Sequence, residues 1–376
     1  MVLISGGHYI HHIKKMKIGI DASSITKEKV TGVENYVRSL VLALNDLQTG
    51  DNFSLYAPAD FFDFPKLNSN FDIVKKPSRK YWGQFTLPRL INKNQPDVVF
   101  FPSNIIAPFI RTKVVYHFHD LAWHFYPKAY SREMRMRQYL AVKRAKMRAE
   151  QVIVSSRSSK NDLVKYFEFD TDKITVIPFG YDRKIKKYRL SEKNRSGIVS
   201  VGRLESRKNT IRLLEAYKLY AAAVDRAEEL TLIGNPGYGF EEIQSELDRS
   251  IKSGFKVKWL SGLDNEEYYK ILGQSKVLLY PTLYEGFGLP ILEAFAGGAA
   301  VLSSDTSSIP EITEDGALLV DPEKTGEIAK ALKMLCLDDS LRTKIIKYGD
   351  HRLKDFSWEK CAASTLKVLE DVAKQT

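Results

Sequence analysis

Short runs of β-branched and aromatic residues alternate with longer helix-like segments along almost the whole chain, and this alternation constrains the fold more than any other feature. The pattern is typical of parallel sheets that are covered by helices on both faces. In the first half of the chain we predict strands at Lys17–Asp21, Asp97–Pro102, Lys113–His117, Gln151–Ser155 and Ile174–Pro178. The helical patterns between these strands lie at Gly32–Leu47, Ser131–Arg148 and Ser158–Tyr166. The first half is therefore expected to form one doubly wound α/β unit.

The strand pattern starts again after a polar, basic stretch at residues 183–195, whose composition indicates an interdomain linker. The strands predicted in the second half are Gly197–Val201, Leu230–Ile233, Val257–Leu260, Lys276–Tyr280, Ala300–Ser303 and Ala317–Val320. A length of 376 residues also fits two domains. Two such units imply a cleft between the carboxyl ends of their strands, where ligands of open α/β sheets usually bind.

The amino-acid composition excludes several classes of protein and indicates the kind of partner to expect. Hydrophobic residues make up 44% and charged residues 27%, which excludes disordered and fibrous classes. The net charge of +11 predicts attraction to an anionic partner without naming one. The chain has only two cysteines, Cys336 and Cys361, which favours a reducing cytoplasm. Its longest apolar stretch, Val98–Ile110, is interrupted and shorter than the roughly 20 residues that span a bilayer, so any membrane contact is expected to be peripheral.

The segment Pro281–Gly298 carries the most specific chemistry. A glycine-rich turn follows a predicted strand, Pro290 suits a first helical turn, and Gly297–Gly298 would end a short helix. Such a turn directs free backbone N–H groups and a helix dipole at a ligand, which favours phosphate. Glu285 and Glu293 would flank the same site, where carboxylates beside phosphate are explained by hydrogen bonds to sugar or ribose hydroxyls. The alternative is that Glu285 is a solvated loop residue and Glu293 a charge near a helix N-terminus.

This segment resembles the Glu-x7-Glu motif of the retaining, nucleotide-sugar-dependent glycosyltransferases of family 4, and the resemblance covers the chain after about residue 15. It implies the GT-B fold, in which two doubly wound Rossmann-like domains face each other across a cleft and a C-terminal helix crosses back to the N-terminal domain. The implied boundaries are an acceptor-side domain at 1–182, the linker at 183–195, a nucleotide-sugar-binding domain at 196–355 and the crossing helix at 356–376. Residues 1–15 match no motif and remain an unexplained extension.

Further motifs extend the resemblance. Val201–Asn209 is similar to the family's turn whose arginine and lysine hold the donor diphosphate, which implies that role for Arg203 and Lys208. A solvated basic turn is the alternative. Ser155–Lys160 resembles a strand-end serine run of the family, but serines before a helix are more often N-caps, and we expect them to be caps here.

Two positions in the first half complete the implied site. Gly32 resembles the glycine that lets an acceptor-side loop approach the donor phosphate, and an ordinary helix-start glycine is the alternative. His119 aligns with the histidine that meets the transferred sugar, and His117, two residues earlier, stays open as the other candidate. The alternative for this position is a structural histidine whose ring nitrogens are hydrogen-bonded inside the domain interface. No cluster with metal-ligand spacing accompanies these histidines, so no metal is expected.

The resemblance implies a retaining, metal-independent hexosyltransferase that moves a sugar to a hydroxyl of a glycan or glycolipid. Arg203, Lys208 and the helix N-terminus after Gly288 would neutralise the leaving diphosphate. The implied catalytic residues are His119, Glu285, Arg203 and Lys208. The implied donor-binding residues are Gly32, Arg203, Lys208, Glu285, Gly286, Phe287, Gly288, Leu289 and Glu293. No cofactor is expected beyond the nucleotide sugar, for which similarity to mannosyltransferases of surface polysaccharide assembly favours GDP-mannose, with a UDP-sugar as the other candidate.

Three alternatives stay open at this point. The basic helix predicted at Ser131–Arg148 is compatible with docking on an anionic membrane, or it is a solvated basic face. A sugar-nucleotide epimerase of the same fold would share the diphosphate site. A non-enzymatic binder of polyanions would explain the positive charge but not the glutamate pair, so no specific nucleic acid is expected.

Overall fold

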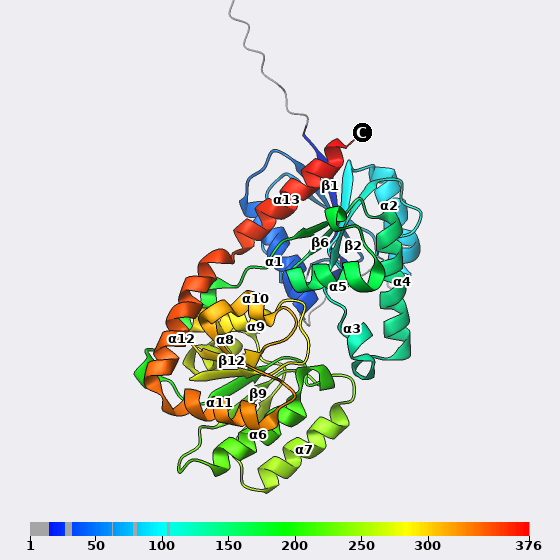
Figure 1. The fold of residues 1–376 in the computed structure, drawn as a ribbon. Helices are drawn as coiled ribbons and strands as arrows, with labels where there is room; N and C mark the ends of the chain where they lie inside the picture. Colours follow the sequence, from blue (N-terminus) through cyan, green and yellow to red (C-terminus); the bar gives the residue numbers. More distant parts are fainter. Residues whose placement is uncertain (1–14, 27–31, 62, 78–80, 104–105, 376) are drawn as a thin grey trace, which may run out of the picture.

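The computed structural model describes residues 15–26, 32–61, 63–77, 81–103 and 106–375, and it contains two parallel sheets (Figure 1). One sheet has seven strands in the order β3-β2-β1-β4-β5-β6-β7, and the other has six in the order β10-β9-β8-β11-β12-β13. We call each sheet with its helices the N-terminal and the C-terminal domain. The two doubly wound domains predicted from the sequence are confirmed. The unexplained extension at residues 1–15 lies outside the described residues except for Lys15.

The N-terminal sheet contains two strands that the sequence did not predict. Its strands are β1 (Lys17–Asp21), β2 (Asn52–Ala57), β3 (Phe71–Lys75), β4 (Val98–Phe101), β5 (Lys113–Phe118), β6 (Gln151–Val154) and β7 (Ile174–Val176). The prediction missed β2 and β3. β3 is an edge strand with no buried side chain, so it lacks the continuous apolar run that reveals an inner strand.

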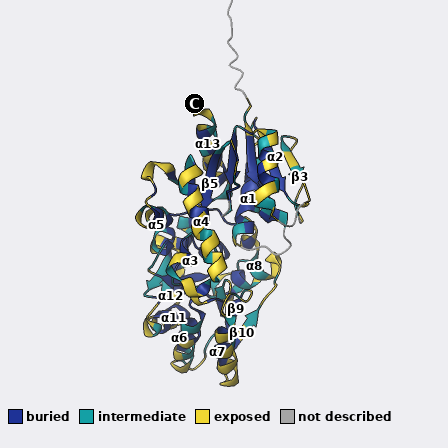
Figure 2. Cartoon of the chain, turned by 90° about the vertical axis from the view of Figure 1, so that its right-hand side faces the viewer, coloured by how far each residue is buried: buried dark blue, intermediate teal, exposed yellow. Residues whose placement is uncertain are grey.

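Helices cover both faces of the N-terminal sheet. They are α1 (Gly32–Asp46), α2 (Leu87–Asn94), the short α3 (Ala122–Phe125), α4 (Arg132–Arg148) and α5 (Arg157–Phe167). Side chains of α2, α4 and α5 join one hydrophobic cluster, and those of α1 join another on the opposite face. Figure 2 shows the sheet as a buried layer and α4 with a largely exposed surface.

All six strands predicted for the C-terminal sheet are present, and each bound agrees within one residue. They are β8 (Ile198–Val201), β9 (Leu230–Ile233), β10 (Val257–Leu260), β11 (Val277–Tyr280), β12 (Ala300–Ser304) and β13 (Ala317–Val320). The helices are α6 (Thr210–Ala222), α7 (Phe240–Lys252), α8 (Asn265–Gln274), α9 (Leu289–Gly297), α10 (Ile309–Thr313), α11 (Thr325–Leu337) and α12 (Asp339–Arg352). Buried side chains of α6, α7 and α11 pack on one face of the sheet, and those of α8 and α9 pack on the other.

The last helix, α13 (Trp358–Lys374), leaves the C-terminal domain and packs against α1, β4 and β5 of the N-terminal domain (Figure 1). Its buried face includes Cys361, Leu366, Leu369 and Val372, which join the same cluster as α1. The crossing helix implied by the family resemblance is therefore confirmed.

The basic stretch at residues 183–195 is anchored to the C-terminal domain. It forms two short 3-10 turns, Arg183–Tyr188 and Glu192–Asn194, and it buries the side chain of Ile185. Arg195 is also buried and donates hydrogen bonds to three backbone carbonyls, those of Leu190, Ser275 and Gly297. A polar composition correctly indicated irregular structure here but could not reveal these single anchoring side chains.

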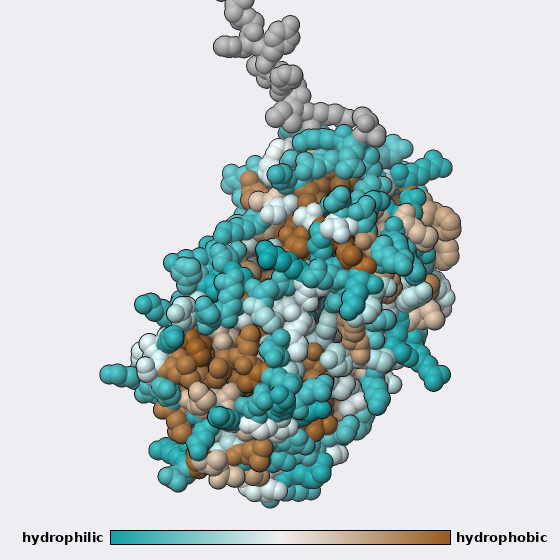
Figure 3. Space-filling view, viewed as in Figure 1, coloured by the Kyte–Doolittle hydropathy of each residue, from teal (hydrophilic) through white to brown (hydrophobic). Residues whose placement is uncertain are grey.

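A row of aromatic rings joins the two domains. The ring of Phe179 lies 4.7 Å from that of Tyr36 in α1 and 4.9 Å from that of Phe287, and Phe287 lies 5.8 Å from Phe356 just before α13. All four side chains are buried and belong to one hydrophobic cluster that continues across both domains. On the face shown in Figure 3, hydrophobic residues reach the surface only in separate areas among hydrophilic ones. The interdomain contact is thus part of the core.

Candidate active site

The glycine-rich turn, Pro281–Gly288, connects the carboxyl end of β11 to α9. Gly288 is the N-cap of α9 with φ of 98°, a left-handed conformation that glycine adopts without a Cβ penalty, and Pro290 occupies the first helical turn, as predicted. Gly286 faces the N-terminal domain so closely that a Cβ there would lie 2.4 Å from the backbone oxygen of His119. The turn therefore contacts both domains and carries a helix N-terminus at the interface between them.

A cluster of four charged side chains lies beside this turn. The Oε1 atom of Glu285 is 2.5 Å from Lys208 Nζ and 3.1 Å from Arg207 Nη1, and it accepts a 2.9 Å hydrogen bond from Thr282 Oγ1. Arg207 also pairs with Glu205 at 3.0 Å. Two cations and two carboxylates thus neutralise one another, and we call these residues (Glu205, Arg207, Lys208 and Glu285) the ion cluster.

Burial and pairing act in opposite directions on the ion cluster. Burial alone would raise the pKa of Glu285, but Lys208 and Arg207 outweigh it and lower that pKa to about 2. Burial lowers the pKa of the Lys208 ammonium, and the Glu285 carboxylate offsets part of that effect. Since only 8% of Glu285 is exposed, the solvated-loop alternative for this residue is wrong.

Arg207 is the site residue that sequence reasoning missed most clearly. Its Nη1 atom donates a 2.8 Å hydrogen bond to the Tyr284 carbonyl, and although burial opposes its charge, the Glu285 carboxylate raises the pKa of the guanidinium. Arg203, which the resemblance nominated, is exposed and makes no hydrogen bond or ion pair with the described residues. Two arginines on one turn carry no sequence signal that distinguishes a paired cation from a free one.

Glu293 lies in an environment opposite to that of Glu285. It is in α9, is 8% exposed, and accepts a 2.5 Å hydrogen bond from the hydroxyl of Tyr268 in α8. Burial raises the pKa of Glu293 to about 7; the Tyr268 hydrogen bond opposes this rise, and the Asp182 carboxylate adds to it. Sequence reasoning did not identify Tyr268. The two glutamates of the Glu-x7-Glu motif therefore differ in pKa because their environments differ.

The two candidate histidines differ in how far they are buried. His117 is fully buried, and neither of its ring nitrogens has a hydrogen-bond partner within the described part of the chain. His119 is half-buried at the end of β5, and its Nε2–H donates a 2.9 Å hydrogen bond to the carbonyl of Pro102. Burial lowers the pKa of His119, and Asp120 partly opposes this shift. His119 therefore lies beside Gly286 at the contact between the domains, and His117 is buried in the core.

The remaining residues predicted to bind the sugar donor differ in their exposure and in which of their atoms a ligand could reach. Gly32 is exposed at the start of α1, and a Cβ placed there would meet no atom of the described residues within 4 Å. The ring of Phe287 is buried between Phe179 and Phe356, which leaves its backbone as the part able to meet a ligand. Leu289 is half-buried.

Comparison with known proteins connects this geometry to a family. A family model described as Glycosyltransferase Family 4 matches residues 30–184, and one described as Glycosyl transferases group 1 matches residues 182–352. O-antigen chain mannosyltransferase B of Escherichia coli is 25% identical over 93% of this chain and 98% of that protein. MMP alpha-(1->4)-mannosyltransferase of Mycolicibacterium hassiacum is 31% identical over 61% of this chain and 56% of that protein. The chain belongs to glycosyltransferase family 4.

The fold of this family 4 glycosyltransferase is GT-B. The crystal structure of Anabaena HepE in complex with UDP-glucose matches it with a TM-score of 0.73 and 18% identity, covering 95% of this chain and 100% of that chain. The enzyme transfers a glycosyl group from a nucleotide sugar, with the retaining mode of its family. The epimerase and polyanion-binder alternatives are not favoured, because the family models and the near-full-length relative all describe glycosyl transfer.

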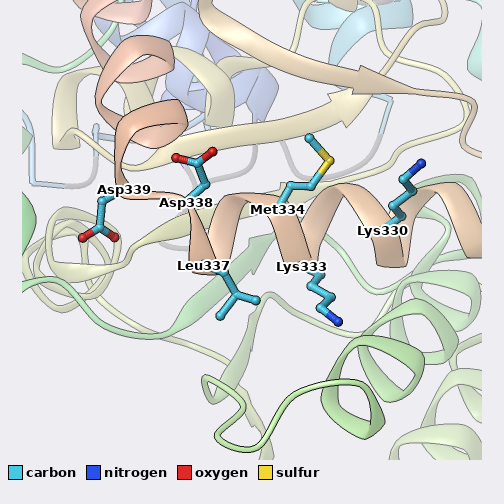
Figure 4. A pocket seen from close by; sticks show the side chains of 6 residues that line it. All are labelled: Lys330, Lys333, Met334, Leu337, Asp338 and Asp339. Atoms are coloured by element: carbon cyan, nitrogen blue, oxygen red, sulfur yellow. The ribbon is translucent and has the colours of Figure 1, made fainter.

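An exposed groove on the C-terminal domain lies outside this site. Figure 4 shows that its lining side chains come from α11 and from the residues where α12 begins, namely Lys330, Lys333, Met334, Leu337, Asp338 and Asp339. None of them belongs to the glycine-rich turn, the ion cluster or the histidine segment.

Among the described residues, no group of three or more His, Cys, Asp or Glu side chains could hold a metal ion. The glycosyltransferase also has no helix in its described ranges that is long and apolar enough to cross a membrane.

We predict that Glu293 makes the stability of this glycosyltransferase depend on pH. A carboxyl whose folded-state pKa is raised stabilises the fold below its ordinary pKa of 4.5, and this contribution disappears as pH rises through about 7. Relative to Glu293→Gln, the wild type should lose about 2 kcal/mol of unfolding free energy between pH 5 and 8. Urea unfolding at both pH values measures this difference. Glu241→Gln, at an exposed glutamate of α7, is the control, and parallel pH profiles of wild type and Glu293→Gln would contradict the prediction.

Proposed function

We propose that this enzyme transfers mannose from GDP-mannose to a hydroxyl group of a glycan or lipid-linked acceptor. The observation that carries this proposal is the alignment of almost the whole chain with a protein named O-antigen chain mannosyltransferase B. A UDP-sugar is the second candidate donor, because the solved structure of Anabaena HepE, which shares the fold, holds UDP-glucose.

In the proposed donor complex, the diphosphate lies over the N-terminus of α9. The backbone N–H groups of Gly286–Gly288 and the helix dipole stabilise its charge, and the exposed side chain of Arg203 is free to reach it. Lys208 exchanges its bond to Glu285 for a phosphate oxygen. Gly32 leaves open space for the donor phosphate on the N-terminal side of the cleft.

The proposed roles of the two glutamates follow from their environments. Glu293 accepts hydrogen bonds from the ribose hydroxyls in place of the one from Tyr268. Glu285, ionised in the ion cluster, accepts from the sugar and stabilises the positive charge that develops on the ring. His119 meets the sugar from the N-terminal side with Leu289 and the backbone of Phe287 nearby on the other.

The proposed reaction is a front-face substitution within an oxocarbenium-like ion pair. The bond between the anomeric carbon and the diphosphate oxygen breaks, the acceptor oxygen bonds to the same face of that carbon, and the acceptor proton passes to the leaving phosphate oxygen. The hydrogen bond of His119 Nε2–H to Pro102 leaves no general base at that nitrogen, which supports proton transfer to the phosphate. The leaving charge is neutralised by Arg203, Lys208 and the helix N-terminus, so the reaction is proposed to need no metal.

A thermal-shift screen of nucleotide sugars tests the proposed donor. We expect GDP-mannose to raise the unfolding midpoint more than GDP-glucose, UDP-glucose or UDP-N-acetylglucosamine at equal concentration, because a ligand that binds the folded state stabilises it in proportion to its affinity. With the preferred donor and a polysaccharide or lipid-linked acceptor, transfer should continue in excess EDTA. A larger shift with UDP-glucose would replace the donor assignment, and loss of transfer that magnesium restores would contradict metal independence.

Three variants test the division of roles in the site. Glu293→Gln should weaken binding of free nucleoside diphosphate and of intact donor alike, because the ribose does not change during the reaction. Glu285→Gln should lower kcat at least about tenfold without weakening nucleoside diphosphate binding, because it removes a carboxylate that competes for Lys208. Lys208→Ala, the reference for a lost phosphate contact, should lower kcat/KM at least about tenfold. Calorimetric titration and steady-state kinetics measure these effects, and reversed behaviour of the two glutamates would overturn the assignment.

We also propose peripheral contact with an anionic membrane through α4. The helix exposes five large hydrophobic side chains: Met134, Met136, Tyr139, Leu140 and Met147. Seven basic residues lie on the same helix: Arg132, Arg135, Arg137, Lys143, Arg144, Lys146 and Arg148. Arg144 and Arg148 bond to the carbonyls of Ile106 and Ile110. By the 3.6-residue period, Met136, Leu140 and Met147 lie on one side of the helix, and exposed apolar side chains among cations fit a membrane interface better than a solvated face.

Vesicle co-sedimentation tests this membrane contact. The protein should bind vesicles that contain phosphatidylglycerol and bind phosphatidylcholine vesicles at least about tenfold more weakly. Met136→Asp combined with Leu140→Asp should reduce the binding, because both side chains are more than half exposed on α4, at 58% and 57%. Leu337→Asp, at a 60% exposed leucine of α11, should not. Equal binding by all variants, or no preference for anionic vesicles, would contradict the proposal.

A further inference from the structure

The segment Ser304–Glu311, between β12 and the end of α10's first turn, runs beside the glycine-rich turn and hydrogen-bonds to its backbone at successive positions. Ser304 and Thr306 donate to the carbonyls of Thr282 and Leu283. Ser307 Oγ accepts from the backbone N–H of Glu285 at 3.0 Å, and Ser308 Oγ donates to the carbonyl of the same residue at 2.9 Å. Both backbone polar groups of Glu285 are therefore held by two adjacent serines.

The far end of this segment binds the other domain. The carboxylate of Glu311 accepts hydrogen bonds from the backbone N–H groups of Arg157 at 3.0 Å and Ser158 at 2.9 Å, the first two residues of α5. Ser156 caps the same helix by accepting from the N–H of Ser159, as the sequence predicted for these serines. Glu311 thus places a negative charge at the positive end of an eleven-residue helix and satisfies two N–H groups that have no partner inside the helix.

The start of α5 in turn contacts the glycine-rich turn. The hydroxyls of Ser155 and Ser159 donate to the carbonyl of Gly286 at 3.2 and 3.4 Å. The connections form a closed loop: Ser307 and Ser308 hold Glu285, Glu311 holds the N-terminus of α5, and α5 holds Gly286. The backbone carbonyl of Glu285 is therefore held from the C-terminal domain, and the next carbonyl, that of Gly286, is held from the N-terminal domain.

We propose that Glu311 is a positioning residue that makes the geometry of the glycine-rich turn depend on contact between the two domains. When the domains separate, Glu311 loses the N–H groups of α5, and Gly286 loses Ser155 and Ser159. The turn then keeps only the bonds from its own domain, and Glu285 and the neighbouring N–H groups are held from one side. The catalytic part of this inference rests on the proposed function of the turn, whereas the contact between domains does not.

Other contacts also join the domains, but they are of a different kind. The Tyr284 hydroxyl lies 2.6 Å from Asp162 Oδ2, and the Tyr126 hydroxyl donates to the Leu283 carbonyl at 3.1 Å. Both contacts depend on a phenol, and the Tyr284 hydroxyl also accepts a 3.3 Å hydrogen bond from the Leu121 N–H. Glu311 makes two charge-assisted bonds from one carboxylate to a helix terminus, which is the stronger and more directional arrangement. Loss of Glu311 is thus expected to weaken domain contact while the phenol contacts persist.

Glu311→Ala and Glu311→Gln test the proposal, with Glu314→Gln as the matched control. Glu314 follows α10 directly, its side chain is 64% exposed, and it pairs with Arg352 of its own domain. We expect Glu311→Ala to lower kcat about tenfold and Glu311→Gln to lower it less, because glutamine keeps one acceptor oxygen. Affinity for free nucleoside diphosphate should stay within about twofold, since that ligand is proposed to bind the C-terminal domain. Small-angle X-ray scattering of the ligand-free protein should show a larger radius of gyration for Glu311→Ala but not for Glu314→Gln.

Arg157→Pro tests the same contact from the other domain. Proline suits the first position of a helix and removes only the N–H that donates to Glu311, while Ser156 already has the extended conformation that precedes proline. Arg157→Pro should act like Glu311→Ala, and the double variant should be little worse than either one.

An unchanged radius of gyration in both Glu311→Ala and Arg157→Pro would overturn the contact, whatever the enzyme's substrate. A larger radius with unchanged kcat would overturn the positioning role, and so would a fall in nucleoside diphosphate affinity equal to the fall in kcat. Failure of wild-type transfer from any nucleotide sugar would instead contradict the proposed function and leave the scattering result to decide the contact.

Discussion

The ion pair between Glu285 and the two cations Lys208 and Arg207 is the interaction on which the rest of the site depends. An unpaired charge at this depth would cost several kcal/mol, so neither cation could be held ready for an anionic ligand without a carboxylate beside it. The pairing keeps the site assembled and electrically balanced before any donor arrives. In the proposed donor complex, the diphosphate competes with Glu285 for Lys208, and binding is an exchange of partners that leaves the carboxylate facing the sugar.

The glycine-rich turn that carries this carboxylate is built by both domains. Gly286 allows the N-terminal domain to approach to a distance that any side chain would prevent, and the ring of Phe287 joins the aromatic row that reaches Tyr36 through Phe179. Helix α13 continues the same cluster onto the N-terminal sheet. Because interiors are close-packed, relative movement of the domains must disturb this row and the turn together. The glycine-rich turn is in this sense a part of the domain interface.

The sequence predicted what depends on local pattern and missed what depends on contacts between distant residues. The six strands of the C-terminal sheet were found because each is a short run rich in apolar and β-branched residues, whereas β3 is an exposed edge strand whose apolar run is interrupted by Asp72. The motif predicted that Glu285, Glu293 and Lys208 belong to one site, but it did not reveal Arg207, Tyr268 or Glu311. Lys208 and Glu285 are 77 positions apart and meet only once the C-terminal domain is folded. Glu311 and Arg157 are 154 positions apart and meet only once the two domains are docked.

The different pKa values of Glu285 and Glu293 show that the spacing of the motif does not determine the protonation state of its two glutamates. Both residues are buried to the same extent beside the same turn, yet Glu285 lies within reach of two cations, whereas Glu293 faces a tyrosine hydroxyl and the carboxylate of Asp182. The first environment favours the ion and the second favours the acid. In its proposed role, Glu293 gains donors from ribose hydroxyls, which favour its ionised form. Ligand binding and proton release are then coupled at Glu293, while Glu285 stays ionised throughout, so the two glutamates contribute to one site through different physical effects.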